Sequence, residues 1–365
     1  MIRVLWQHCL RPRRVRCVLG IVLLSTLLSA CLPPKPPRIV KIGLVAPFEG
    51  RYRYVGYDAI YAARLAVREI NAAGGVAGWM LELTAYDDRA DPDMARTAAR
   101  NLITDPDVVA VIGHYRQAST LAARALYTEA QMPLLVVGTW LTPTAAPVWF
   151  ILPTPEQAAA AMLSAVPLAD ATAGTWGDGA LAVALNDALR KHNDRMIPSA
   201  STFPDVVFST LPPVEAASRL VAWRAAGWDG TLIGDIDLAA PEFAVVAGDA
   251  GEGALFVTPY RLPQDDLALE AWRVAYRAVG PHVPEPGVYA RATYDAVYAL
   301  AEAIAAAALT DGQPSRSGIQ AALPNVRHAG ASGTVVWDET GYWRDGPLYV
   351  YVWEQARARL VDSRR

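Results

Sequence analysis

The segment that follows Gly113 carries residues whose types and spacing suit the binding of a small anion. A continuous apolar run ends at Gly113, and Ser119 followed by Thr120 is typical of the start of a helix. The backbone N–H groups in between would lie at the positive end of that helix, where a carboxylate is stabilised. The candidate ligand contacts in this segment are Tyr115, Arg116, Gln117 and Ser119. Arg116 either attracts an anionic ligand or is a solvated side chain, and the sequence leaves both interpretations open.

A second candidate loop consists of Gly138, Thr139 and Trp140. It follows the next apolar run and would form the adjacent wall of the same site. Trp140 either stacks on a ligand or fills space in the core. Trp176, which precedes Gly177, allows the same two interpretations. The two loops together predict a small-molecule site at one edge of a sheet.

For the other residues that could do chemistry, the sequence context favours structural roles. No serine or cysteine in a recognisable elbow accompanies His114, so we expect this histidine to be packed or hydrogen-bonded. The aspartates at 87, 88, 91 and 93 lack the glycine and closing glutamate of a calcium loop and are typical of strand ends and helix caps. The glycines at 248–253 do not have dinucleotide-binding spacing. We therefore expect a protein that is not an enzyme, with no metal and no cofactor.

The N-terminus predicts export. Residues 1–30 combine five arginines and no acidic residue with an apolar run at 17–28, as in a secretion signal. The sequence at 28–31 (LSAC) resembles the bacterial lipobox, in which the signal is cut before a cysteine that is then acylated. An uncleaved membrane helix is the alternative, but Arg16 and Pro33 bound a run shorter than the roughly 20 residues that span a membrane. We expect an extracytoplasmic protein anchored through a lipid on Cys31.

Composition limits the partners of the exported chain. Without residues 1–30 the chain has 28 basic and 36 acidic side chains, a net charge of −8. This balance argues against nucleic acid or an anionic membrane surface as the main partner. Cys31 is then the one remaining cysteine, so no internal disulfide can form. The proline-rich residues 31–38 would be an extended tether, and the remaining length is typical of two domains.

These candidate residues need a parallel sheet to position them. The first half alternates short apolar runs with amphipathic segments, which predicts strands at 39–46, 80–86, 108–112 and 134–137 with three helices between them. Such an order implies right-handed crossovers and a doubly wound sheet, which binds ligands beyond the carboxyl ends of its strands. The second half is less regular. We expect strands at 206–208, 232–234, 254–258, 333–337 and 348–353, the last two around a turn at 338–341, and helices at 181–189, 216–226, 265–279 and 288–308.

Motifs along nearly the whole exported chain resemble the branched-chain amino acid binding proteins of ABC importers. They are 41–47 (KIGLVAP), 66–75 (AVREINAAGG), 86–88 (YDD), 91–92 (DP), 111–114 (VIGH), 119–120 (ST), 225–227 (AAG), 252–258 (EGALFVT), 294–296 (YDA) and 337–341 (WDETG). The resemblance implies a type I periplasmic-binding-protein fold of two doubly wound α/β lobes joined by crossing hinge strands. Lobe 1 would comprise 39–151 and 259–337, and lobe 2 would comprise 152–258 and 338–365. Shortened stretches at 150–176 and 189–206 predict a reduced second lobe.

The resemblance also implies roles for single residues. In the family the two first-lobe loops hold the ligand carboxylate and part of its amino group, and an acidic second-lobe residue completes the ammonium contact. That acid aligns near Ile236, so either Asp235 or Asp237 would serve. Tyr54 stands beside an aromatic position of the family, and Trp176 matches an aromatic residue at the cleft mouth. Gln117 and Trp140 replace a serine and a threonine of the family, so the chain departs from the family pattern in both loops.

The leading prediction is a lipid-anchored solute-binding protein that captures a small amino acid, or a related amide or carboxylate, and delivers it to an ABC permease. One alternative is a sensing module with the same fold, which would pass ligand-induced closure to a membrane partner. The other is a degenerate scaffold that binds no ligand because Trp140 fills the pocket.

Overall fold

The computed structural model describes residues 37–142, 148–169, 171–192, 203–263, 267–331 and 333–361. The predicted signal peptide, Cys31 and most of the predicted tether lie outside these residues. Arg38, the last residue of that tether, already begins the first strand, β1 (Arg38–Ala46).

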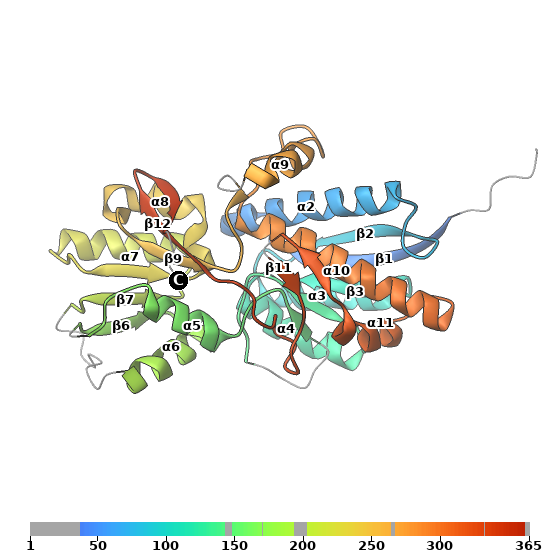
Figure 1. Cartoon of the computed structure of the whole chain (residues 1–365), viewed down its shortest axis with the longest axis horizontal. Helices are drawn as coiled ribbons and strands as arrows, with labels where there is room; N and C mark the ends of the chain where they lie inside the picture. Colours follow the sequence, from blue (N-terminus) through green and yellow to red (C-terminus); the bar gives the residue numbers. More distant parts are fainter. Residues whose placement is uncertain are drawn as a thin grey trace, which may run out of the picture. The chain divides into compact units, whose positions relative to one another are not determined.

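The first sheet has the strand order β2-β1-β3-β4-β5. Strands β1, β3, β4 and β5 pair in parallel. Every residue of β3 is buried, because helices cover both faces of the sheet (Figure 1). The other strands are β2 (Trp79–Asp87), β3 (Val108–Gly113), β4 (Leu134–Val136) and β5 (Val148–Phe150).

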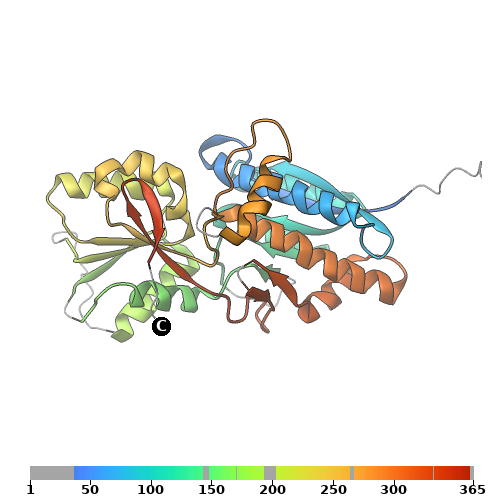
Figure 2. The ribbon, with the colours of Figure 1, turned by 45° about the horizontal axis from the view of Figure 1, so that its top comes forward.

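Two pairs of helices pack on this sheet. Helix α2 (Arg53–Ala72) lies beside α10 (Val288–Asp311), and α3 (Pro92–Thr104) lies beside α4 (Gln117–Glu129) (Figures 1 and 2). Among the described residues, α10 alone is long and apolar enough to cross a membrane, but 67% of its apolar window is buried inside the fold. It is the central core helix of this half. Smaller helices here are α9 (Glu270–Arg277) and α11 (Arg316–Ala322).

The second sheet has the order β13-β12-β9-β8-β7-β6. Its strands β6 to β9 are parallel, and the last two strands are added antiparallel at the edge. Helices α5 and α6 cover one face, and α7 and α8 cover the other (Figure 1). The strands are β6 (Ala173–Trp176), β7 (Val206–Ser209), β8 (Thr231–Gly234), β9 (Leu255–Thr258), β12 (Tyr349–Glu354) and β13 (Arg357–Leu360). The helices are α5 (Pro155–Ser164), α6 (Gly179–His192), α7 (Pro213–Ala225) and α8 (Pro241–Ala247).

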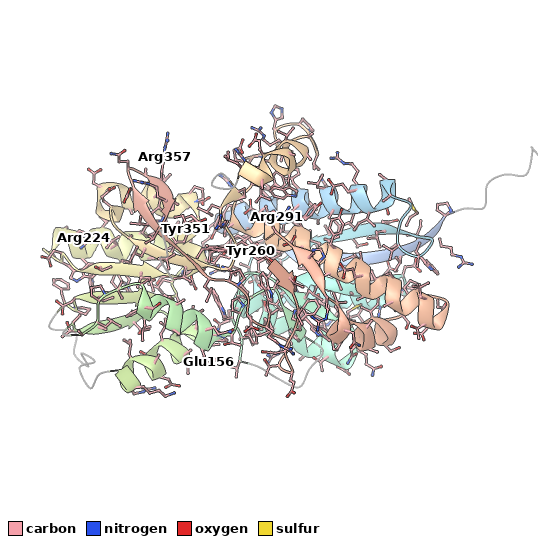
Figure 3. The ribbon with its side chains drawn as sticks, viewed as in Figure 1. Glu156, Arg224, Tyr260, Arg291, Tyr351 and Arg357 are labelled. Carbon is pink, nitrogen blue, oxygen red and sulfur yellow. The ribbon has the colours of Figure 1, made fainter. Side chains whose placement is uncertain are left out.

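The chain passes from one sheet to the other after β5, after β9 and before β12. The crossing after β9 is bonded to strand β12, because the backbone N–H of Leu262 donates to the Tyr351 hydroxyl at 2.9 Å. Figure 3 labels Tyr351 on β12 and Tyr260 just beyond β9, near the middle of the molecule. The structure thus has the predicted α/β class, with parallel strands and helices on both faces of each sheet.

Several predicted elements differ from the structure. The strand at the predicted 333–337 is β11 (Gly333–Val335), which pairs with β10 (His328–Gly330) and not with β12 across the expected turn. The helix predicted from 265 begins at Glu270, after a short 3₁₀ turn. Among the described residues the second sheet has six strands and the first has five, and the reduction of the second lobe relative to the family stays a prediction.

Candidate functional site

One cavity of about 50 Å³ lies where the carboxyl ends of strands from both sheets meet. Nearly all its lining residues follow the end of a parallel strand by one to four positions, as Arg116 follows β3 and Thr210 follows β7. We call it the cleft cavity. Its lining residues are Arg116, Gln117, Gly138, Thr139, Trp140, Asp178, Leu181, Thr210, Asp235 and Asp237. Seven of the eleven predicted ligand contacts are among them.

The first turn of α4 faces this cavity. The helix begins at Gln117, two residues earlier than predicted, with Arg116 as an extended N-cap residue whose side chain makes no capping bond. The prediction that Ser119 and Thr120 open the helix is therefore wrong, because both lie inside its first turn. The Thr120 hydroxyl donates to backbone carbonyls, whereas the buried Ser119 hydroxyl has no partner among the described residues. The helix presents a positive end without a capping side chain, which suits an anion.

A buried ion pair crosses the cleft cavity. Nη1 of Arg116 lies 2.6 Å from both carboxylate oxygens of Asp237, and the Tyr289 hydroxyl donates to Oδ1 of the same carboxylate at 2.7 Å. The two charged side chains are 15% and 7% exposed. Burial alone would lower the pKa of Arg116, but the charge of Asp237 raises it above its usual value. The guanidinium is thus charged and paired, which is neither of the two arrangements considered from the sequence.

Asp235 lies beside this pair. Its Oδ1 accepts the backbone N–H of Asp237 at 3.0 Å and caps the 3₁₀ turn at 236–239. Burial, followed by the charge of Asp237, raises the pKa of Asp235 well above its ordinary value. Of the two aspartates predicted to contact a ligand ammonium, Asp237 is the one that contacts Arg116 and Tyr289.

Close backbone approaches shape both walls of the cavity. Gly138 has φ +81°, and a Cβ there would overlap the ring of Tyr289. Gly179, at the start of α6, has φ +91°, and a Cβ there would overlap the side-chain amide of Gln117. Only glycine allows these contacts, so the backbone at Gly138 and Gly179 is adapted to the side chains across from it.

Trp140 is both a core residue and part of the wall. Its side chain is buried, and its indole N–H donates to the carbonyl of Pro153 at 3.0 Å. Thr139, next to it, is also buried and lines the cavity. Trp140 therefore restricts the cavity without closing it.

Four predicted contacts lie elsewhere. The Tyr115 hydroxyl bonds to Thr293 of α10 at 2.7 Å. Trp176 packs edge-on against Trp223, with ring centres 4.7 Å apart. Ser119 lies in the first turn of α4, outside the lining. Tyr54 lines a second cavity of about 190 Å³ together with Tyr289 and Asp58, and its buried hydroxyl has no partner among the described residues.

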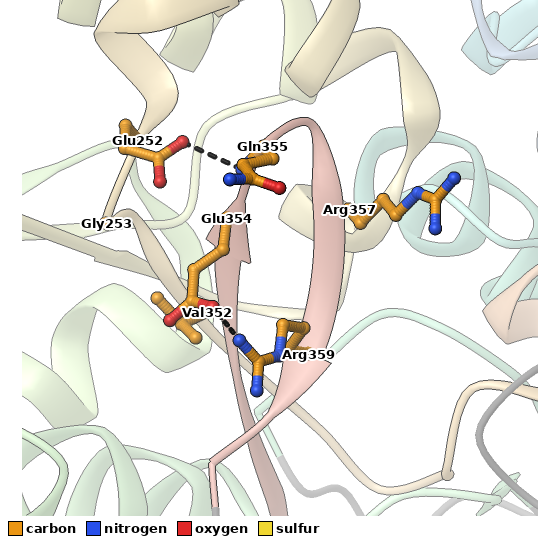
Figure 4. Close-up of a pocket in the computed structure, with 7 residues that line it drawn as sticks. All are labelled: Glu252, Gly253, Val352, Glu354, Gln355, Arg357 and Arg359. Atoms are coloured by element: carbon orange, nitrogen blue, oxygen red, sulfur yellow. Dashed lines mark hydrogen bonds and ion pairs between the residues drawn. The ribbon is translucent and has the colours of Figure 1, made fainter.

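A third, larger hollow of about 490 Å³ lies at the β12–β13 hairpin. Figure 4 shows its lining, which includes an ion pair between Arg359 and Glu354 and a bond from the Gln355 backbone N–H to Glu252 at 2.9 Å. We call it the hairpin pocket. None of the predicted ligand contacts lies there.

The other chemistry-bearing residues have structural roles. His114 is buried, with Nδ1 2.7 Å from Asp88 and Nε2 3.2 Å from the Tyr127 hydroxyl, which confirms the expected hydrogen-bonded histidine. Asp91 caps α3, as predicted. Within the described ranges, no group of three or more His, Cys, Asp or Glu residues could hold a metal ion.

Sequence reasoning missed four residues of the site. Thr210 follows a predicted strand, so its position at the sheet edge was a usable signal, and Asp178 and Leu181 follow β6, a strand that was not predicted. Tyr289 reaches Asp237 from the start of α10, and no spacing in the sequence indicates this contact.

Comparison with known proteins gives three consistent findings. A family model described as periplasmic binding protein matches residues 39–188 and 200–358. The leucine-specific-binding protein of Salmonella typhimurium is 26% identical over 359 residues, covering 86% of this chain and 90% of that protein. A Streptococcus pneumoniae branched-chain amino acid transporter substrate binding protein, solved with isoleucine, superposes with a TM-score of 0.74 at 21% identity, covering 89% of this chain and 99% of that one.

A second solved structure, a solute binding protein of an ABC transporter from R. palustris in complex with benzoate, has a TM-score of 0.70 at 18% identity, covering 88% of this chain and 95% of that one. The fold is thus that of type I periplasmic binding proteins, as the resemblance predicted. Since the family model spans most of its length, this chain belongs to the periplasmic binding protein family.

Proposed function

We propose that this protein is an extracytoplasmic solute-binding protein that captures a small amino acid, or a related amide or carboxylate, in the cleft cavity for an ABC importer. The uncapped start of α4, which faces the cleft cavity, is the observation that carries the proposal. Backbone N–H groups at a helix start are ready donors for a carboxylate. The two lobes that close on the solute would be 39–151 with 259–337, and 152–258 with 338–365.

Three similar proteins whose ligands are known support a carboxylate as the ligand of this protein. One is named as leucine-specific, and the other two were solved with isoleucine and with benzoate. These ligands share a carboxylate but differ in the rest of the molecule. The likeness therefore supports a carboxylate as the class of ligand and does not identify the ligand.

Membrane attachment and delivery complete the proposal. Signal cleavage before Cys31 and acylation of its thiol would hold the protein at the outer face of the membrane, near its permease. Metabolic labelling with a radioactive fatty acid tests this step. Cys31→Ser should abolish the label and release the protein from the membrane fraction, whereas unlabelled native protein would contradict the lipid anchor.

A thermal-shift screen of residues 31–365 against amino acids, short amides and small acids tests capture. A ligand that binds the native state alone stabilises it by about 2.7 kcal/mol at one hundred times its dissociation constant, which raises the melting temperature. No shift at millimolar concentration of any compound would contradict capture.

A variant pair tests the contact with α4 directly. Gln117→Pro removes one N–H at the first helical position, where proline is well tolerated, and the extended Arg116 before it is compatible with proline. Gln117→Ala removes the same side chain but keeps the N–H. We expect the proline variant to bind the ligand about tenfold more weakly than the alanine variant, the loss of about one charge-assisted hydrogen bond. Equal affinities would contradict binding at this helix start.

A non-binding scaffold is the second candidate, and the small cleft cavity favours it. A volume of about 50 Å³ is well below the roughly 300–1,000 Å³ of typical ligand pockets. A screen without any melting shift would support this candidate.

A further inference from the structure

We propose that the cleft cavity selects carboxylates that lack an ammonium group, because Arg116 already provides the positive partner of Asp237. This inference rests on the proposed function, since it assumes that the cavity binds a carboxylate. It narrows the ligand from amino acids and their relatives to acids without a positive charge.

Asp237 has no simple way to receive a second cation. Both of its carboxylate oxygens lie 2.6 Å from Nη1 of Arg116, and Oδ1 also accepts the Tyr289 hydroxyl. A ligand ammonium beside Asp237 would either lie next to the Arg116 guanidinium, whose charge repels it, or displace that guanidinium and leave it buried without a counter-charge, and both are unfavourable. The charge of the Asp237 carboxylate is therefore already compensated by the protein.

Arg116 is itself held in place from another side. Its guanidinium carbon lies 4.5 Å from the ring centre of Tyr52, within the range of a cation–π contact. The charge of Asp237 also raises the pKa of Arg116, so loss of a proton cannot free the carboxylate. Arg116 acts as a built-in positive group in the place that a ligand ammonium would need.

The other carboxylates of the lining do not restore a cation site. Asp235 has a raised pKa because of burial and the nearby Asp237, which favours its neutral form. Asp178 is exposed, so water screens its charge. With Asp237 paired, the uncapped start of α4 adds positive potential to the cavity, and this favours an anion over a zwitterion.

Calorimetric titration with matched pairs of ligands tests the inference on residues 31–365. Each pair has one carbon skeleton with and without the ammonium group: leucine and 4-methylpentanoate, valine and 3-methylbutanoate, phenylalanine and 3-phenylpropanoate. We expect the native protein to bind the acid at least about tenfold more tightly than the amino acid in the pair that binds best, as buried unpaired charge predicts.

Arg116→Gln tests the cause of this preference. The variant frees Asp237, so the preference should fall or reverse toward the amino acid. Arg96→Gln, which removes an exposed arginine paired with Asp93 on α3, is the control and should keep the native preference. If Arg116→Gln does not fold, the native preference still decides the inference.

The outcomes separate the inference from the proposed function. Equal or tighter binding of the amino acids by the native protein would overturn the inference and leave the proposed function intact. Binding of no compound at millimolar concentration, either in these pairs or in the thermal-shift screen, would overturn both.

Discussion

The cleft cavity and the hairpin pocket both contain an arginine–carboxylate pair, yet they differ in size and burial in opposite ways. The hairpin pocket is larger, about 490 Å³ against about 50 Å³. Its pair, Arg359 and Glu354, is 71% and 40% exposed, whereas Arg116 and Asp237 are 15% and 7% exposed. Exposed pairs contribute little to stability or specificity, while a buried pair strongly constrains what else can bind beside it. Burial and pairing, more than volume, are why we propose the cleft cavity as the ligand site.

A large effect on stability is expected at Asp237, in the buried pair of the cleft cavity. Asp237→Ala leaves Arg116 buried without its counter-charge, so we expect the free energy of unfolding to fall by about 3 kcal/mol. Urea denaturation followed by tryptophan fluorescence measures it. A loss below about 1 kcal/mol would show that water already screens the cleft pair as it screens the hairpin pair.

The pH dependence of stability tests a second buried carboxylate that contacts Tyr289, that of Asp58. Asp58 is buried, accepts the backbone N–H groups of Gly287 and Tyr289, and has its pKa raised by burial from 3.8 to about 7. The folded state therefore binds this proton more tightly than the unfolded state, and stability falls as the pH rises from about 4 to about 7.

The raised pKa corresponds to a loss of up to about 4 kcal/mol across this range. Asp58→Asn should flatten that part of the curve of unfolding free energy against pH. A native curve without a decline between pH 5 and pH 7 would contradict the assignment.

Alanine substitutions at two glycines with positive φ test how tightly the walls of the two pockets are packed. Gly138→Ala in the cleft places a methyl group into the Tyr289 ring, whereas Gly253→Ala in the hairpin pocket meets no atom within 4 Å. We expect the free energy of unfolding to fall by about 3 kcal/mol for Gly138→Ala and by about 1 kcal/mol for Gly253→Ala. In both variants alanine is strained at a positive φ, and at Gly138 its methyl group also overlaps the Tyr289 ring. Equal melting temperatures for the two variants would disprove a tight wall at Gly138.

The smallest effect is expected at the hairpin pair. Glu354→Gln should change the free energy of unfolding by less than about 1 kcal/mol and leave ligand affinity unchanged. A loss of ligand binding in this variant would move the site from the cleft to the hairpin.

Much of the fold could be predicted because it depends on local patterns. Strand β3 is a continuous apolar run, and Asp91 followed by Pro92 predicts the start of α3 correctly. Strand β6 was missed because Gly174 and Thr175 interrupt any apolar run, whereas the equally short β7 begins with one. Strand β13 is rich in arginine, because its side chains are mostly exposed at the sheet edge.

Site residues could be predicted from the sequence only where they follow the end of a predicted strand. Arg116 and Asp237 were both candidates, but they are 121 positions apart in the chain, and no spacing rule predicts that they pair. The start of α4 at Gln117 was also misplaced, because Ser119 and Thr120 are good capping residues that the helix does not use as caps. Side-chain pairs between residues this far apart in the chain therefore cannot be predicted from the sequence alone.

A crystal structure of the protein grown with the tightest-binding carboxylate of the screen tests the central claim most directly. We expect the carboxylate oxygens within hydrogen-bond distance of the backbone N–H groups at the start of α4, with the pair between Arg116 and Asp237 intact. A carboxylate bound in the hairpin pocket beside an empty cleft would contradict the account.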